Sequence, residues 1–331
     1  MTSPTADKLV FETGVPGARS IADRWIYKFA GRVVRTMARL SSATLLSLWK
    51  RGRQNWPGKA ITSCIEVLQT TPGNVPVVWL APGHSSNGVI VQLHGGAYVS
   101  GPMARQWNWM AEVHKRTSAA MAMLLYRMPP DHPYPAALDD AVNAILDMQK
   151  SGHLVAGKWI LCGDSSGGGL ALAVVSRLIE MHCAPPAGLL LTAPWVDLAM
   201  NSAELDASER SDGFLHRSWL GWAARLYAGG RSLEDPLLSP LFGSFKGFPP
   251  VHINIGTRDM LLPDVRRLRD KLLAADVFVH YMEQDGGIHT YPFLLETREA
   301  QATVALQVKW IKRTLCRDPL DGATQGVPII G

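Results

Sequence analysis

The chain has 331 residues, of which 47% are hydrophobic and 18% are charged, so it can bury one large core and is not a disordered chain. No window holds the roughly 18 uninterrupted apolar residues of a spanning helix, and the N-terminus lacks the apolar stretch of a signal peptide. The four cysteines have neither CxxC spacing nor a nearby His cluster, which argues against a zinc site and a disulfide framework. We therefore expect a cytoplasmic protein without stable membrane insertion.

The net charge of +5 is concentrated near the N-terminus. Residues 19–53 hold nine Lys or Arg against the single Asp23, whereas the rest of the chain has 24 basic and 27 acidic residues. Basic and apolar residues recur there at three- and four-residue steps on different faces, which predicts an amphipathic helix. Such a helix can lie on an anionic membrane, but we expect it to pack on the main body. No nucleic-acid-binding module accompanies the charge, so no nucleic-acid partner is expected.

From residue 61 onward, short β-rich runs alternate with helical segments. The strands are expected at 61–69, 75–82, 88–96, 121–127, 158–163, 188–194, 251–256 and 277–283. Helices are expected at about 103–118, 136–151, 166–182, 263–276 and 294–314. Continuous Val/Ile/Leu runs between helices predict an α/β protein with a mostly parallel eight-stranded sheet and helices on both faces. Residues 198–240 carry helical signals where a connection should be short, which predicts an insertion.

The segment Gly163-Asp164-Ser165-Ser166-Gly167 is a G-x-S-x-G pattern between a predicted strand and a predicted helix. In that context the pattern is typical of a nucleophile elbow, in which a sharp turn forces the central serine outward. Side chains at 163 and 167 would collide with neighbouring backbone, which explains the glycines. Ser165 is therefore the candidate nucleophile. The alternative is a glycine-rich turn in which Ser165 merely caps the helix.

A serine nucleophile needs a base and an acid. In folds with a nucleophile elbow, the three residues follow one another along the chain in the order Ser, Asp or Glu, His. Asp259 is the best acid because it lies in the turn after the strand 251–256. Asp264 is the second choice, and capping of the following helix explains it better. His289 follows the last strand and is the expected base. His252 and His280 lie inside predicted strands, and His216 lies in the predicted insertion.

An oxyanion hole is expected in the run His94-Gly95-Gly96-Ala97, which follows a strand. Glycines there let backbone N–H groups converge on a reacting carbonyl oxygen. The expected donors are the N–H groups of Gly96, Ala97 and Ser166, the last at the positive end of a helix. His94 is expected to support this loop and not to take part in chemistry.

The segments "HGGAYVSG", "YRMPPDHPYPAALDD", "GDSSGGGLA", "DPLLSP", "GTRDMLLPD" and "GGIH", in this order over about residues 88–293, resemble the bacterial hormone-sensitive-lipase-like family of α/β-hydrolase carboxylesterases. The resemblance implies an α/β-hydrolase fold with nucleophile, acid and base at Ser165, Asp259 and His289. It also implies a helical cap built from an N-terminal arm and an insertion. The expected parts are an N-terminal cap arm (1–55), the first part of the core (56–197), a cap insertion (198–240), the second part of the core (241–315) and a C-terminal tail (316–331).

Three departures from the family pattern stand out. Ala97 occupies the place of a third glycine, so its methyl group is expected to restrict the backbone and narrow the substrate pocket. Asp131 stands where the family commonly has Glu, a change expected to touch a structural contact. "GGIH" replaces a Gly-Met-Pro-His approach, which predicts a looser loop before His289.

The expected activity is hydrolysis of short- to medium-chain carboxylic esters, of about two to eight carbons, or of lactones. The mechanism requires no cofactor and no metal, and the expected partner is a small-molecule ester. Tyr98, Trp25 and Trp219 are expected to line the substrate pocket. Trp107, Trp109 and Trp222 belong to the same aromatic group, for which packing of cap against core is the alternative.

Two other functions stay open at this point. An amidase or thioesterase could use the same triad. A non-catalytic small-molecule receptor could use the same fold, although the three triad residues together argue against it. A homodimer is conceivable through an edge strand, for which the strand 277–283 is the candidate.

Overall fold

The structure is a computed structural model that describes residues 8–14, 47 and 54–316. The strands of its nine-stranded sheet are β1 (Leu9–Thr13), β2 (Val67–Thr70), β3 (Val77–Leu80), β4 (Val89–Leu93), β5 (Ala120–Leu124), β6 (Trp159–Asp164), β7 (Gly188–Thr192), β8 (Val251–Gly256) and β9 (Val279–Gln284). Their spatial order is β1-β9-β8-β7-β6-β4-β5-β3-β2. Only the pairings of β3 with β2 and with β5 are antiparallel, so the predicted α/β class with a mostly parallel sheet is confirmed.

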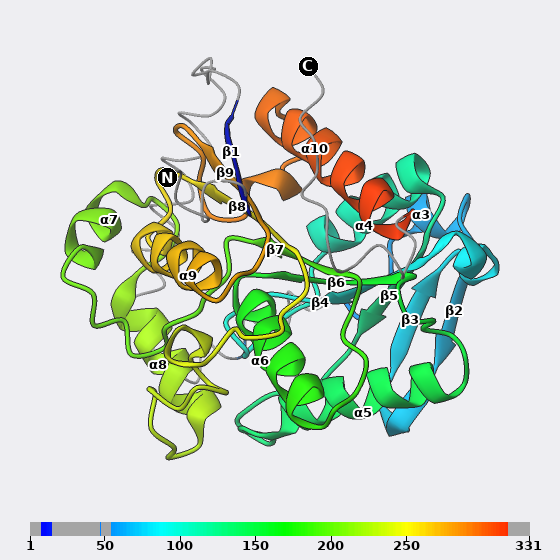
Figure 1. The fold of residues 1–331 in the computed structure, drawn as a ribbon, viewed down its shortest axis with the longest axis horizontal. Helices are drawn as coiled ribbons and strands as arrows, with labels where there is room; N and C mark the ends of the chain where they lie inside the picture. The colour runs from blue at the N-terminus through cyan, green and yellow to red at the C-terminus, as the bar shows by residue number, and fades with distance from the viewer. Residues whose placement is uncertain (1–7, 15–46, 48–53, 317–331) are drawn as a thin grey trace.

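Helices cover both faces of the sheet (Figure 1). They are α3 (Lys59–Thr62), α4 (Ala104–Thr117), α5 (Ala136–Lys150), α6 (Ser166–Glu180), α7 (Leu205–Ser211), α8 (Arg217–Ala228), α9 (Leu262–Ala274) and α10 (Arg298–Leu315). Single 3-10 turns occur at η2 (Pro72–Asn74), η3 (Pro82–Asn87), η4 (Pro240–Phe242) and η5 (Tyr291–Phe293). No helix in the described part of the chain has the length and apolar character that a membrane crossing requires.

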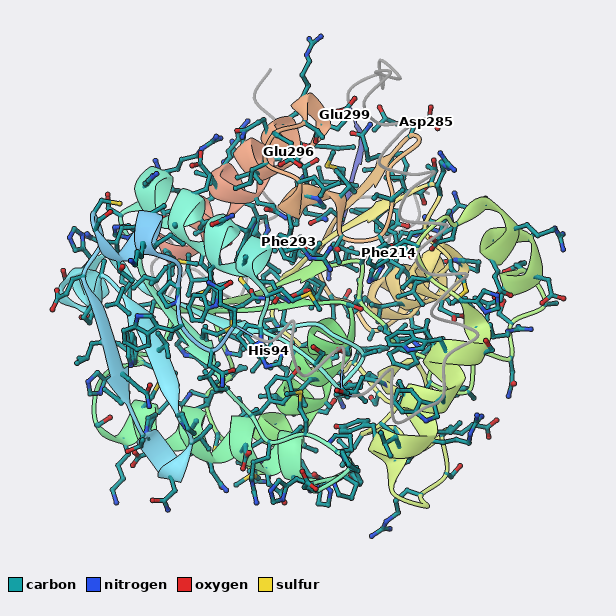
Figure 2. The ribbon with its side chains drawn as sticks, turned by 180° about the vertical axis from the view of Figure 1, so that it is seen from behind. His94, Phe214, Asp285, Phe293, Glu296 and Glu299 are labelled. Atoms are coloured by element: carbon teal, nitrogen blue, oxygen red, sulfur yellow. The ribbon has the colours of Figure 1, made fainter. Side chains whose placement is uncertain are left out.

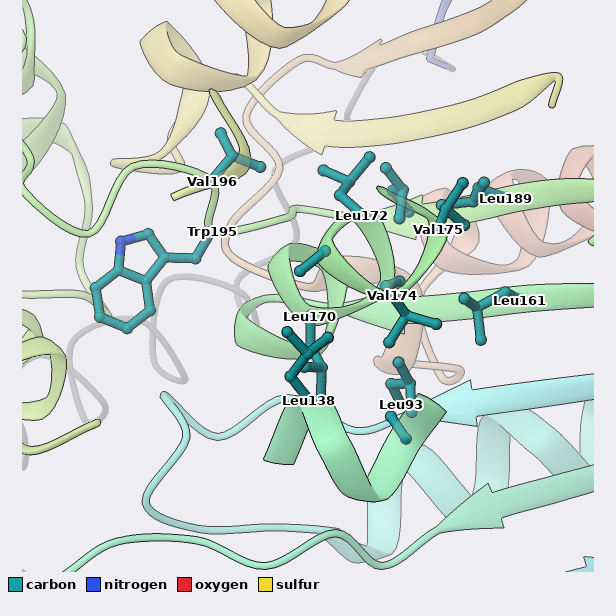
Figure 3. Close-up of a cluster of buried hydrophobic side chains, with 14 of the residues drawn as sticks. Leu93, Leu138, Leu161, Leu170, Leu172, Val174, Val175, Leu189, Trp195 and Val196 are labelled. Atoms are coloured by element: carbon teal, nitrogen blue, oxygen red, sulfur yellow. The ribbon is translucent and has the colours of Figure 1, made fainter. Parts of the chain in front are cut away.

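Two apolar cores lie on opposite faces of the sheet. One contains buried residues of α4 and α10, and the other contains buried residues of α5, α6, α8 and α9. Figure 3 shows part of the second core, where Leu170 and Val174 of α6 lie near Leu93 of β4 and Leu161 of β6. All residues of β4 to β8 are buried, because these strands are covered on both sides. This explains their continuous apolar sequences.

The sheet has one strand more than the sequence analysis predicts. β1 pairs in parallel with β9, so the strand 277–283 is not an edge strand, and its predicted role as a dimer edge is wrong. β1 escapes detection because it has five residues, none of them fully buried. The exposed edge is β1 itself, on which Val10 is 41% and Phe11 49% exposed.

The predicted strand at 61–69 is wrong in its first half. Residues 59–62 form α3, and only β2 at Val67–Thr70 is extended. Ile61 and Ile65 are both buried, and their four-residue spacing is that of one helix face. The β-branched residues in this run suggested a strand, but burial of one side favours a helical turn.

The interval 198–240 lies between β7 and β8 and contains α7 and α8. Leu220, Ala223 and Tyr227 of α8 are buried in the same core as α5 and α6. The division into cap and core stays a prediction. The N-terminal arm (1–55) and the C-terminal tail (316–331) lie almost wholly outside the described residues, and so does the predicted basic helix in residues 19–53.

Candidate active site

Ser165 lies between the end of β6 and the start of α6 with φ 52° and ψ −123°. A residue other than glycine in such a region costs on the order of 1–3 kcal/mol and persists only where its surroundings hold it. Ser165 is held on both sides: its N–H donates to the Thr192 carbonyl at 2.9 Å, and its carbonyl accepts from the Trp195 N–H at 2.8 Å. The strand, turn and helix predicted around Ser165 are present.

The glycines of the elbow allow close backbone contacts. A Cβ on Gly163 would lie 2.2 Å from the Gly167 carbonyl oxygen, and one on Gly167 would lie 2.1 Å from the Leu93 carbonyl oxygen. The structure therefore confirms the predicted collisions. Because the backbone lies so close, only glycine fits at these two positions.

The structure brings together the three residues proposed as a triad. His289 Nε2 lies 2.9 Å from Ser165 Oγ, and His289 Nδ1 lies 2.8 Å from Asp259 Oδ2. The other oxygen of Asp259 accepts the Leu261 N–H at 2.9 Å. All three side chains are buried, Ser165 at 8% exposure being the most accessible. The chain of contacts runs from hydroxyl to imidazole to carboxylate, as proton transfer from serine requires.

The pKa of His289 is raised above its ordinary value by competing influences. Burial alone lowers the pKa of His289, since it disfavours the imidazolium. The charge and hydrogen bond of Asp259, with a smaller contribution from Asp212, outweigh that effect. The protonated imidazole that forms during proton transfer is stabilised accordingly.

The other candidate acids and bases have different positions. Asp264 accepts from Arg267 Nη1 at 2.9 Å in the first turn of α9, whose N-cap residue is Leu261, so the predicted capping role of Asp264 is wrong. His252 and His280 contact each other inside the sheet, with their Nδ1 atoms 2.6 Å apart. His216 precedes α8 and lies 3.3 Å from Glu209.

The loop after β4 adopts an unusual backbone at three successive residues. Gly96, Ala97 and Tyr98 have φ values of 130°, 54° and 62°. The N–H groups of Gly96, Ala97 and Ser166 make no hydrogen bond to any residue that the structure describes. The Tyr98 N–H donates to Ser166 Oγ at 3.1 Å, which fastens the loop to the start of α6. The three predicted donors are thus available to an oxyanion, and Ala97 accepts the left-handed backbone usual for glycine.

Asp164, the residue before Ser165, ties this loop to the elbow. Its Oδ1 accepts from Gln92 Nε2 at 2.9 Å, the Gly95 N–H at 3.0 Å and Gln106 Nε2 at 3.0 Å. Burial raises the pKa of Asp164, while these donors and the charge of Arg105 oppose the rise. The sequence analysis misses this role, because the variable position of the G-x-S-x-G pattern carries no signal of its own.

His94 has the supporting position expected of it. It is fully buried and stacks on Tyr126, with ring centroids 4.2 Å apart and planes at 11°. The Tyr126 hydroxyl donates to the His94 carbonyl oxygen. His94 Nδ1 lies 3.1 Å from the carbonyl oxygen of Gly95. These contacts connect the loop after β4 to the segment after β5.

The insertion supplies contacts that the sequence analysis misses. Asp212 accepts the N–H groups of Phe214 at 2.6 Å and Leu215 at 2.9 Å, and its second oxygen accepts the Met260 N–H at 2.7 Å. Burial, with the charge of Asp259, raises the pKa of Asp212 to about 6. The ring of Phe214, which is labelled in Figure 2, lies 6.2 Å from that of His289 at an angle of 21°. Asp212 thus joins the insertion to the turn that carries the acid.

The loop before His289 is tied to the same turn. The Arg258 N–H donates to the Gly287 carbonyl at 3.0 Å, and the Gly286 N–H donates to Thr257 Oγ1 at 2.8 Å. A Cβ on Gly256 would lie 2.1 Å from the Gly287 carbonyl oxygen. The looser loop expected from "GGIH" is therefore held by direct contacts.

The three residues predicted to line the pocket have different positions. Tyr98 is fully buried and stacks on Tyr227 of α8 at 3.6 Å and 3°. Trp219 is partly buried against the core on α8, and Trp25 lies outside the described residues.

Two further tryptophans of the aromatic group, Trp107 and Trp109, lie in a core. Trp107 and Trp109 are buried on α4 in the core that it shares with α10, so the packing alternative holds for both. Their indole N–H groups donate to the Gln54 carbonyl and to Gln307 Oε1. Among the described residues, no group of three or more His, Cys, Asp or Glu is arranged to hold a metal ion.

Comparison with known proteins agrees with this geometry. Residues 90–293 match a family model described as alpha/beta hydrolase fold. The chain is 32% identical to an acetyl-hydrolase of Streptomyces hygroscopicus over 70% of its own length and 78% of the relative's. It is also 32% identical to an esterase of Acinetobacter venetianus over 67% of its own length and 74% of the relative's.

Solved structures are similar over most of the chain. A crystal structure of an esterase from the bacterial hormone-sensitive lipase family aligns with a TM-score of 0.78 and 26% identity, over 87% of this chain and 98% of that one. The crystal structure of EstE5 soaked with p-nitrophenyl butyrate aligns with a TM-score of 0.80 and 25% identity, over 90% of this chain and 100% of that one.

Proposed function

The chain belongs to the α/β-hydrolase family, with bacterial hormone-sensitive-lipase-family esterases among its structural neighbours, and on this premise we propose that it is a serine carboxylesterase. Its substrates are short- to medium-chain carboxylic esters, and lactones belong to the same class of reaction. The observation that carries the proposal is the continuous contact from Ser165 Oγ through His289 to Asp259, at 2.9 Å and 2.8 Å.

The reaction proceeds in two acyl transfers. Ser165 Oγ attacks the ester carbonyl carbon while His289 Nε2 takes the hydroxyl proton, and Asp259 stabilises the imidazolium. The N–H groups of Gly96, Ala97 and Ser166 hold the developing oxyanion. His289 then gives its proton to the leaving alcohol, and an acyl group remains on Ser165. A water molecule, deprotonated by His289, attacks this acyl group and releases the acid.

The preference for short acyl groups has two supports. One of the relatives is named an acetyl-hydrolase, and the EstE5 crystals were soaked with p-nitrophenyl butyrate, an ester with a four-carbon acyl group. The second support is the proposal that Ala97, which stands in place of a glycine in the loop of oxyanion donors, narrows the acyl pocket. A bulky acyl chain would have to pass this loop. Residues 198–240, with α7 and α8, are the described part of the proposed cap over the substrate.

The test is hydrolysis of a p-nitrophenyl ester series from acetate to palmitate by the wild type and by Ser165→Ala. We expect the wild type to prefer acyl chains of about two to eight carbons. Ser165→Ala should lower kcat by about a millionfold, the scale of triad knockouts in other enzymes. A variant that keeps most of its activity would exclude Ser165 as nucleophile. Rates that rise steadily toward palmitate would contradict the proposed chain length.

A further inference from the structure

Arg105 lies in the first turn of α4, shortly after the loop that carries the proposed oxyanion donors. Its side chain is half-buried, and its Nε atom is enclosed without a hydrogen-bond partner. Within the described part of the chain, the guanidinium forms neither a hydrogen bond nor an ion pair. A cation at this end of a helix also meets the positive end of the helix dipole. Hydrogen bonding and ion pairing within the described residues therefore do not explain why an arginine stands here.

Its surroundings connect Arg105 to the reacting centre. The guanidinium carbon lies 5.7 Å from the centre of the Phe214 ring, and that ring lies 6.2 Å from the ring of His289. The charge of Arg105 lowers the pKa values of His289 and of Asp164, so both groups are within its electrostatic reach. The Phe214 ring therefore lies close both to Arg105 and to the candidate catalytic base.

The two carboxylates near Arg105 and Phe214 already accept hydrogen bonds from other groups. Asp164 accepts from Gln92, Gln106 and the Gly95 N–H. Asp212 accepts three backbone N–H groups. Neither forms an ion pair with Arg105, so within the described residues its two Nη groups have no carboxylate partner, while Nε is enclosed. A guanidinium presents five N–H donors in a planar fork that matches a carboxylate.

We propose that Arg105 binds a carboxylate carried by the ester substrate, so that the preferred substrates are esters with an anionic group a few bonds from the reacting carbonyl. This inference rests on the proposed esterase function and narrows its substrate class. Phe214 provides the apolar wall along which the uncharged part of such a substrate would lie, between the reacting carbonyl and Arg105.

Two pairs of substrates test the proposal, each consisting of an anionic ester and its neutral amide analogue. Monoethyl succinate and ethyl succinamate vary the acyl side, and 3-acetoxypropanoate and 3-acetoxypropanamide vary the alcohol side. We expect wild type to prefer the anionic member of at least one pair. Arg105→Gln should lower that preference, the ratio of the two kcat/KM values, by about 10- to 100-fold. Arg105→Lys should lower it less, because a point charge is kept without the fork.

A matched control removes one positive charge elsewhere. Arg313→Gln, in the exposed last turn of α10, should leave the ratio unchanged. If Arg105→Gln lowers kcat/KM equally for both members of each pair, the proposal is overturned and Arg105 has a structural role. Wild type with no preference in either pair would overturn it as well.

A binding measurement separates this inference from the esterase function. Calorimetric titration of Ser165→Ala with monoethyl succinate requires no turnover. Adding Arg105→Gln to that variant should weaken binding by about 10- to 100-fold. If wild type hydrolyses no ester but this difference is found, the esterase proposal fails and the anion site stands. If binding does not depend on Arg105, the anion site fails whatever the activity.

Discussion

At the elbow, close backbone contacts hold the candidate nucleophile in place and leave no room for an added methyl group. At the loop that carries the candidate acid, a side chain from the insertion makes the stabilising contact instead. A Cβ on Gly163 or Gly167 would lie within 2.2 Å of a carbonyl oxygen. Asp212, by contrast, reaches from residues far along the chain to accept the Met260 N–H beside Asp259. The first region is specified by residue types at fixed spacing, and the second by which segments the fold brings into contact.

The difference predicts unequal responses to mutation. At the elbow, substitution of the buried carboxylate or of the tightly packed glycines should lower activity strongly. Around Asp259 and His289, the direct contacts of the triad should persist when the insertion is changed, so activity should fall less. The three predictions below test this contrast, from the largest expected effect on activity to the smallest.

Asp164→Asn tests the elbow. Asparagine keeps one neutral oxygen to accept from Gln92 and the Gly95 N–H, but its NH2 group would face Gln106 Nε2, another donor, so the loop that carries the oxyanion donors should shift. Loss of hydrogen bonds to a charged group predicts a fall in kcat of about 10- to 150-fold, with KM less affected. Asp270→Asn, on the exposed face of α9, is the matched control. Equal kinetics of the two variants would show that Asp164 does not position the loop.

Tyr227 tests whether the insertion also supports the oxyanion loop. Its ring stacks on Tyr98 at 3.6 Å, and its buried hydroxyl has no hydrogen-bond partner in the described part of the chain. An aromatic pair contributes about 0.5–1.5 kcal/mol, so Tyr227→Leu should lower kcat by about 2- to 12-fold. Tyr227→Phe keeps the stacked ring and should behave as wild type. If both variants lose activity equally, the hydroxyl and not the stack is responsible.

Asp212→Asn tests the contact of the insertion with the acid and base loops. The charge of Asp212 contributes to the raised pKa of His289, and His289 must be neutral to accept the serine proton. Removing that charge should lower the pKa of His289. The acidic limb of the kcat/KM profile against pH should therefore move to lower pH. Asp206→Asn, on the same insertion but paired with exposed Arg217, should leave the limb in place. A limb that moves to higher pH would contradict this electrostatic account.

The local patterns predicted most of the sheet and the parts of the site that lie directly at strand ends. Ser165 follows β6, Asp259 follows β8 and His289 follows β9, so each was found from a strand and the turn after it. β1 was missed because five half-exposed residues carry little periodic signal. The sequence predicts a strand at α3 because a single helical turn has too few residues to establish a period.

Contacts between distant segments could not be predicted in the same way. Nothing in the sequence near Asp212 indicates that its carboxylate will meet the Met260 N–H, 48 residues further along the chain. Asp264 was expected to cap α9, but the helix begins earlier, so Asp264 lies in its first turn and pairs with Arg267. The N-cap lies three residues before Asp264, at Leu261, and this displacement is enough to change the role of a side chain.

The sequence alone determined the fold class, the elbow and the three residues proposed as a triad, because periodicity, glycine placement and order along the chain are local properties. Only the tertiary structure decided that β9 is covered by β1, that Asp164 joins the elbow to the loop after β4, and that Arg105 has no partner among the described residues. These features depend on which side chains meet after the sheet has formed and its helices have packed. The free energy of burial and hydrogen bonding at such a contact depends on two residues that are distant in the sequence. The spacing of residues within one segment does not specify which distant residue will be the partner.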